Sequence, residues 1–254
     1  MSHYLTVALE VAQRAKTILL ASQQQFKSLE VKPNNSVVTE LDRQIEEEAK
    51  SIIHEHFPDH GFYGEETARE ALEAEYVWIV DPIDGTREFT RGLPFFSTLV
   101  ALKRGEEFIV GVSMSPRVGE LIYAEKGAGA WRNGERIQVS SRSDLRTSFV
   151  VGPAYKYLQR TNSFSMMAAL AEDVQGTRNV GAYPGYSWVA AGHAEAMIEV
   201  DTFIYDVAPF ITIITEAGGK VTDLQGNPLS LDSTHILASN GVLHEEILEY
   251  FAGF

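Results

Sequence analysis

The first twenty residues carry apolar side chains at intervals of three and four, the spacing of one face of an α-helix. Ala8, Val11, Ala15 and Ile18 belong to this stripe, and polar side chains fill most positions between them. The pattern predicts a helix that buries one face against the rest of the molecule. Residues 31–38 contain a proline and two asparagines and predict a loop or a short hairpin.

A second amphipathic helix is predicted over residues 39–56. Thr39 is a suitable N-cap, because its hydroxyl can accept a hydrogen bond from a free N–H of the first turn. Ala49 and Ile53 belong to the apolar stripe, and Pro58 ends the pattern. The chain therefore begins with two helices.

Strand-like apolar runs replace the helical spacing after residue 75. The first run ends at Asp81-Pro82, and Asn133-Gly134 is typical of a two-residue hairpin turn. The predicted strands span residues 76–80, 95–102, 108–114 and 119–125.

Residues 140–144 are polar and separate these strands from a second half in which strands and helices alternate. We expect strands at 148–151, 196–200 and 220–222, and helices at 162–171, around 187–191, at 207–217 and from residue 243. The order predicts an α+β domain over residues 1–142 and an α/β domain over residues 143–254.

The six residues from Asp81 to Thr86 form the strongest local motif. Asp81 and Asp84 flank a proline directly after a strand, and the carbonyl of Ile83 adds a third oxygen. Carboxylates and carbonyls without His or Cys indicate Mg²⁺ rather than Zn²⁺. Gly85 permits close approach of a ligand to the backbone, and the residues after it would open a short helix whose free N–H groups suit a phosphate.

Two further acidic segments are candidates for the same site. Glu65, in the run Gly64-Glu65-Glu66, precedes the strand that carries Asp81, and Asp206 precedes the helix predicted from residue 207. Each also has an ordinary explanation. A pair of glutamates is common on a solvated surface, and an aspartate before a helix is a common N-cap.

Charge and cysteine content narrow the classes of function. The 254 residues include 21 Lys and Arg against 35 Asp and Glu, which gives a formal charge of −14, and there is no cysteine. This charge disfavours binding to nucleic acids and to anionic membrane surfaces. The lack of cysteine excludes disulfides and fits a reducing compartment. No export or membrane-spanning segment is evident, so we expect a cytoplasmic protein.

The motifs resemble those of the inositol monophosphatase superfamily in type and in order along the chain. The resemblance rests on Val38-Thr39 with Asp42, Gly64-Glu65-Glu66, residues 78–86, Asn133-Gly134, residues 205–208 and residues 216–219. It implies a layered αβαβα fold, a homodimer and the hydrolysis of a small phosphorylated metabolite with two or three Mg²⁺ ions. Li⁺ and Ca²⁺ are then expected to inhibit.

The resemblance also implies the metal ligands. Glu65, Asp81 and the carbonyl of Ile83 would hold one ion. Asp81, Asp84 and Asp206 would hold a second ion, and Glu65 would contribute to a weaker third site.

Further roles implied by the resemblance concern the phosphate and the attacking water. The N–H groups of Gly85 and Thr86 would bind the phosphate. Thr86, paired with Asp42, would help to deprotonate the water, together with the metal ligand Glu65. Glu66 would lie just behind the metal ligands.

The substrate is expected to be a small ester such as inositol 1-phosphate. Glu199 lies seven residues before Asp206, where inositol-type members bind a substrate hydroxyl, and Asp206 would also border the substrate. The short spacing from Gly181 to Gly192 is more similar to histidinol-phosphatases and 3′-phosphoadenosine 5′-phosphate phosphatases. Histidinol-phosphatases often carry an aspartate where this chain has Ala182. Fructose 1,6-bisphosphate, or a sensor of sugar phosphates without catalysis, are the remaining alternatives.

Overall fold

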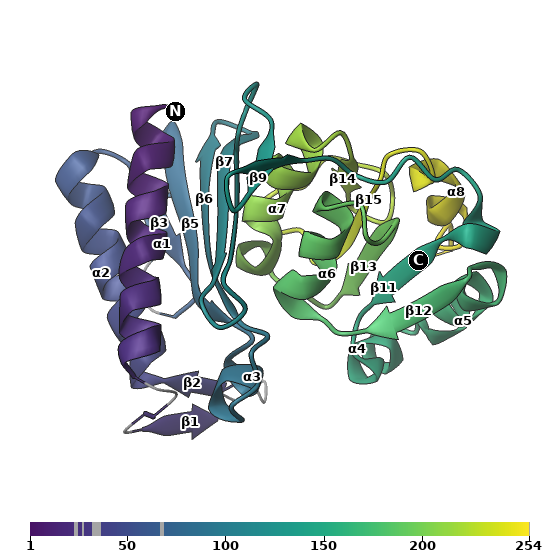
Figure 1. Ribbon diagram of the computed structural model, residues 1–254, viewed down its shortest axis with the longest axis horizontal. Helices are drawn as coiled ribbons and strands as arrows, with labels where there is room; N and C mark the ends of the chain where they lie inside the picture. Colours follow the sequence, from purple (N-terminus) through teal and green to yellow (C-terminus); the bar gives the residue numbers. More distant parts are fainter. Residues whose placement is uncertain (23–24, 27, 32–36, 67–68, 254) are drawn as a thin grey trace.

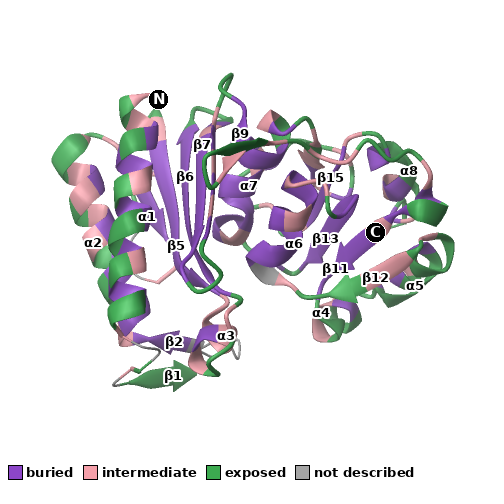
Figure 2. Cartoon of the chain, viewed as in Figure 1, coloured by how far each residue is buried: buried purple, intermediate pink, exposed green. Residues whose placement is uncertain are grey.

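The chain folds into five layers in the order helix, sheet, helix, sheet, helix (Figure 1). A computed structural model describes residues 1–22, 25–26, 28–31, 37–66 and 69–253. The helices at the amino-terminal end turn their apolar faces toward the larger sheet and expose their polar faces, whereas the helix layer between the two sheets is largely buried (Figure 2). The expected layered αβαβα sandwich is confirmed. No helix within the described residues has both the length and the apolar character needed to cross a bilayer.

The outer layer at the amino-terminal end consists of the two predicted helices, α1 (His3–Ala21) and α2 (Glu40–His56). Thr39 caps α2, since its hydroxyl accepts from the N–H of Leu41 at 3.2 Å. Ahead of α2, β1 (Leu29–Val31) and β2 (Val37–Thr39) form an antiparallel pair, as a hairpin requires. Residues 32–36 of the predicted hairpin lie outside the described residues.

The larger sheet has eight strands in the order β10-β9-β8-β7-β6-β5-β3-β4. Adjacent strands of this sheet run antiparallel, except for β3 and β5, which are parallel. The predicted turn at Asn133-Gly134 joins β9 to β10 with positive φ at both residues, as a type I′ turn requires. The strands are β3 (Gly61–Gly64), β4 (Arg69–Glu70), β5 (Tyr76–Asp84), β6 (Ser97–Arg104), β7 (Glu107–Ser115), β8 (Glu120–Glu125), β9 (Ala130–Arg132) and β10 (Glu135–Ile137).

The middle layer, α6 (Ala182–Ala190) and α7 (Ile204–Glu216), lies between the two sheets (Figure 1). The smaller sheet has the order β12-β11-β13-β15-β14, and three of the helices given below, α4, α5 and α8, form the last layer. The proposed domain boundary falls between the last strand of the first sheet and the first strand of the second, and the division into two domains there stays a prediction. These elements are β11 (Phe149–Gly152), α4 (Tyr155–Arg160), α5 (Phe164–Asp173), β12 (Gly176–Asn179), β13 (Ala196–Val200), β14 (Lys220–Thr222), β15 (His235–Ser239) and α8 (His244–Glu249).

Among the predicted boundaries that were wrong, two lie at the candidate site. Strand β5 does not end at Asp81-Pro82 but continues to Asp84. Helix α7 begins at Ile204 rather than at residue 207, so Asp206 lies within its first turn instead of before it. The apolar pattern also did not predict β3, β4, α4, β12 and β15, which are too short to show a clear period.

Candidate metal and substrate site

Strand β5 brings Asp81 and Asp84 to the same side of the larger sheet. In a regular strand, residues three apart face opposite sides. Here the register with β6 shifts between the two aspartates, so that two residues of β5 lie opposite Thr98 alone. This bulge turns Asp84 toward Asp81. Pro82 is tolerated at the bulge, where its carbonyl accepts from the hydroxyl of Thr98 at 2.8 Å.

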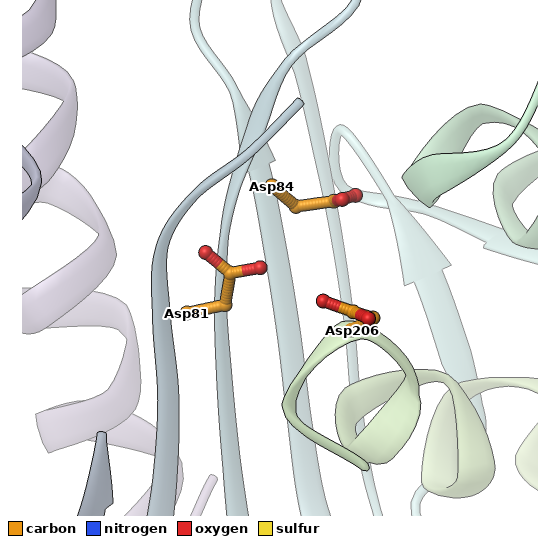
Figure 3. A group of neighbouring side chains, drawn as sticks. All are labelled: Asp81, Asp84 and Asp206. Carbon is orange, nitrogen blue, oxygen red and sulfur yellow. The ribbon is translucent and has the colours of Figure 1, made fainter. Parts of the chain in front are cut away.

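Asp206 reaches the same place from the first turn of α7. One of its oxygens, Oδ2, accepts from the hydroxyl of Thr202 at 2.8 Å and from the N–H of Phe203 at 3.1 Å. These bonds hold the start of the helix and fix the direction of the carboxylate. Asp81, Asp84 and Asp206 each place one oxygen within 4.8 Å of the others, and the three carboxylates face a common space (Figure 3). Asp206 is therefore both a capping residue and a member of the acidic cluster.

Burial and mutual repulsion raise the free energy of this cluster when its carboxyl groups are ionised. Only 1% of Asp81 and 7% of Asp84 are exposed. Burial raises the pKa of both groups well above the usual range. The Glu65 carboxylate raises the pKa of Asp81 further, and the Asp206 carboxylate raises the pKa of both. Oδ1 of Asp81 is buried and has no hydrogen-bond partner among the described residues. A divalent cation would remove the repulsion and supply the missing partner, so the donor set fits a hard metal ion.

Glu65 is placed beside Asp81 by the parallel pairing of β3 and β5. Gly64 lies opposite Val80 in this pairing, and the N–H of Glu65 donates to the carbonyl of Val80 at 3.2 Å. Its negative charge is among the causes that raise the pKa of Asp81. The two glutamates are therefore not merely solvated surface residues, because Glu65 borders the acidic cluster.

Glu46 of α2 holds this turn and was not predicted from the sequence. Its side chain is fully buried, and Oε2 accepts from the N–H of Glu66 at 2.6 Å. A Cβ on Gly64 would lie 2.3 Å from the carboxylate carbon of Glu46, so any larger residue there would displace this carboxylate. A signal was present in the sequence, since Glu46 lies four residues after Asp42 and three before Ala49, on the buried face of α2.

The structure brings Asp42 and Thr86 together. Asp42 is buried in the first turn of α2, where Oδ2 accepts from the N–H and the hydroxyl of Thr39 at 2.7 and 2.6 Å. Its other oxygen lies 3.2 Å from the hydroxyl of Thr86, which is also 2.8 Å from the carbonyl of Ile83. Burial raises the pKa of Asp42 to about 6. Thr86 can therefore donate its single proton either to Asp42 or to Ile83.

Gly85 begins the short helix α3 (Thr86–Thr90), as expected. Its φ is +88°, and a Cβ would lie 2.7 Å from the carbonyl oxygen of Phe95. The backbone of the protein itself therefore requires glycine here, in addition to any need for close approach of a ligand.

A single cleft of about 270 Å³ collects the candidate residues. Glu65, Ile83, Gly85, Thr86, Glu199 and the three aspartates all line it, whereas Asp42 lies behind Thr86. Glu199 is 8% exposed and accepts from the hydroxyl of Tyr186 at 2.8 Å. Asp84 accepts from the N–H of Tyr183 at 2.5 Å, which joins the start of α6 to the acidic cluster.

Comparison with known proteins shows which family has this sequence and this fold. The model of the inositol monophosphatase family matches residues 1–253. The chain belongs to the inositol monophosphatase family. It is 34% identical to the histidinol-phosphatase of Chlorobaculum parvum over 98% of this chain and 96% of that protein. It is 35% identical to the fructose-1,6-bisphosphatase/inositol-1-monophosphatase of Thermotoga maritima, over 84% of this chain and 81% of that protein.

Solved structures of the family share the fold over nearly the whole chain. The IMPase of Thermotoga maritima superposes with a TM-score of 0.89 at 29% identity, covering 98% of this chain and 96% of that one. The inositol monophosphatase of Anabaena gives a TM-score of 0.87 at 30% identity, covering 98% and 95%. The family consists of metal-dependent phosphatases, and its match to this chain supports a phosphatase activity. The acidic triad of Asp81, Asp84 and Asp206 could hold metal ions.

Proposed function

We propose that the protein hydrolyses a small phosphate monoester to an alcohol and inorganic phosphate, using two or three Mg²⁺ ions. The observation that carries this proposal is the aspartate triad, in which Asp81 and Asp84 are buried and Oδ1 of Asp81 has no hydrogen-bond partner among the described residues. When bound, the metal ions lower the pKa of the attacking water and neutralise charge on the phosphoryl oxygens. The proposed ligands are Glu65, Asp81, the Ile83 carbonyl, Asp84 and Asp206.

The remaining residues of the cleft hold and prepare the reactants. The N–H groups of Gly85 and Thr86 are the proposed phosphate donors, since both residues line the cleft. The Thr86 hydroxyl, supported by Asp42, would accept a proton from the attacking water and pass its own to the carboxylate. Li⁺ and Ca²⁺ are expected to inhibit, because neither reproduces the charge and octahedral geometry of Mg²⁺.

Inositol 1-phosphate is the first candidate substrate. Glu199 supports it, because a carboxylate at the wall of the cleft can accept a hydrogen bond from a hydroxyl of a polyol. Histidinol phosphate is the second candidate. It is favoured by the similarity to the histidinol-phosphatase of Chlorobaculum parvum over almost the full length of both chains, and its ammonium group would find acidic partners at Glu199 and Asp201. 3′-Phosphoadenosine 5′-phosphate and fructose 1,6-bisphosphate are the remaining candidate substrates, and the same test includes them.

A homodimer in the cytoplasm is part of the proposal. The dimer rests on the family resemblance, and the cytoplasmic location rests on the absence of cysteine from the sequence. Light scattering on the purified protein tests the dimer, and a monomer across the accessible concentration range would contradict it.

Phosphate release measured with the four esters, with Mg²⁺ or with EDTA, tests the proposed function. We expect turnover of at least one ester that depends on Mg²⁺ and is lost in Asp84→Asn while the folded structure remains. Asp59→Asn, which changes an exposed aspartate outside the cleft, is the matched control and should keep full activity. Release that persists in EDTA, or in Asp84→Asn, would contradict the metal assignment. Tight binding of an ester without hydrolysis would instead support the sensor.

A further inference from the structure

The residues that line the cleft are of two chemical kinds. Carboxylates and α3 surround the proposed reacting centre, whereas Tyr157, Val180 and Phe203 add apolar and aromatic surface to the same cleft. Phe203 is 44% exposed and Val180 is 40% exposed. Large apolar side chains left open to solvent inside a ligand cleft indicate contact with an apolar part of the ligand.

Phe203 is held in place on one side and is tied to the acidic cluster. Its ring stacks on Tyr205 with 5.2 Å between centroids and 16° between the planes. Tyr205 is itself buried and meets Tyr63 edge to face. The N–H of Phe203 donates to Asp206 at 3.1 Å, which holds the backbone that carries the ring beside this proposed metal ligand. A second flat ring can therefore stack on Phe203 at little cost in ordering the protein.

Helix α4 provides the polar border of this region. Arg160 of α4 lies 3.3 Å from the carboxylate of Asp201, on the loop that leads to Phe203. Arg160, Asp201 and Tyr157 all line the cleft. The ammonium of Lys156 lies over the ring of Tyr157, 4.2 Å from its centroid. The apolar surface is thus bordered by one donor and one acceptor that can meet the polar edge of a heteroaromatic ring.

We propose that Phe203, Val180 and Tyr157 form a subsite for a flat aromatic ring on the alcohol side of the phosphate ester, of the size of an imidazole or a nucleobase. Phe203 is its central residue. A polyol carries a hydroxyl on every ring carbon and gains little from a phenyl face, whereas an aromatic ring gains a stacking contact. The inference rests on the proposed function, and it ranks the two aromatic candidates, histidinol phosphate and 3′-phosphoadenosine 5′-phosphate, ahead of inositol 1-phosphate, which the family resemblance put first.

A matched pair of esters tests the subsite directly. Benzyl phosphate and cyclohexylmethyl phosphate have similar leaving groups and carbon skeletons but differ in the flatness of the ring. We expect kcat/KM to favour the benzyl ester by about threefold to tenfold in the wild type, the range expected for one aromatic contact. Phe203→Ala should abolish this preference mainly through KM, because the contact is the same in ground and transition states. Phe203→Tyr should retain it, and Phe203→Leu, which is apolar but not flat, should not.

Control variants and a binding measurement separate failure of the subsite from failure of the proposed function. Phe164→Ala changes another exposed aromatic residue that does not line the cleft and should leave the preference unchanged. Titration calorimetry of histidinol phosphate with Ca²⁺ in place of Mg²⁺ should show weaker binding to Phe203→Ala than to the wild type, even if no ester is hydrolysed. Equal binding to both proteins would overturn the subsite. An equal loss of activity on both matched esters would show that Phe203 only supports Asp206, which also overturns it.

Discussion

Replacing Asp81 by asparagine should stabilise the metal-free protein and remove most of its stabilisation by Mg²⁺. The carboxylate is buried among like charges, with two other aspartate oxygens within 4.8 Å. At an effective dielectric constant of about 20, two unit charges at this distance repel each other by about 3.5 kcal/mol. Partial protonation relieves some of this repulsion, since the pKa of Asp81 is raised. We therefore expect a gain of about 2 kcal/mol, or about 4–8 °C in Tm for a chain of this size.

The effect should depend on pH in a defined direction. A carboxyl group whose pKa is raised on folding stabilises the folded state at low pH, and this contribution is lost as pH rises through the raised pKa. The metal-free wild type should therefore lose stability between about pH 5 and about pH 8, and Asp81→Asn should lose less. Mg²⁺ should raise the Tm of the wild type most at the higher pH.

Thermal unfolding in EDTA and in Mg²⁺ at both pH values measures these differences. Asp59→Asn is the control for the change in net charge, because this residue is exposed and lies outside the cleft. A lower Tm for metal-free Asp81→Asn, or an undiminished response of this variant to Mg²⁺, would refute the reasoning.

Substitutions at three further residues test the supports of the site. Thr86→Val removes the hydroxyl 3.2 Å from Asp42 and should lower kcat by about a hundredfold with little change in Tm; a steady-state assay that finds normal kcat would remove Thr86 from the proposed proton path. Glu46→Ala leaves the N–H of Glu66 without this acceptor, so half-maximal activity should need about tenfold more Mg²⁺ than in the wild type. Glu46→Gln keeps an acceptor and should need less Mg²⁺ than Glu46→Ala. Equal Mg²⁺ requirements of the two variants and the wild type, in titrations of activity, would contradict this. Gly85→Ala places a Cβ 2.7 Å from the carbonyl of Phe95 at positive φ and should cost about 1–3 kcal/mol of stability, and an unchanged midpoint of urea unfolding would count against the strain.

Local patterns in the sequence predicted the regular elements well, because periodicity is a property of neighbouring residues. The stripes of α1 and α2 and the turn at Asn133-Gly134 gave elements close to those observed. The end of β5 was predicted wrongly, since Pro82 usually ends a strand and a bulge depends on the register with β6. A bulge is a property of two paired strands, so the pattern of β5 alone does not reveal it.

The candidate site was predictable where its residues are adjacent in sequence. Asp81 and Asp84 form a recognisable motif, but their convergence requires the bulge. Asp206 lies more than a hundred residues away, and only the resemblance to a family placed it with them before the structure did. Glu46 was missed because a glutamate on a helix is usually solvated, although it lies on the buried face with Asp42.

Anomalous diffraction from crystals grown with Mn²⁺, a divalent ion with oxygen preferences similar to those of Mg²⁺, tests the central claim most directly. We predict a strong peak about 2.0–2.3 Å from carboxylate oxygens of Asp81, Asp84 and Asp206. The peak should be absent from crystals of Asp84→Asn. A peak confined to another part of the molecule, in a protein whose hydrolysis is activated by Mn²⁺, would contradict the account.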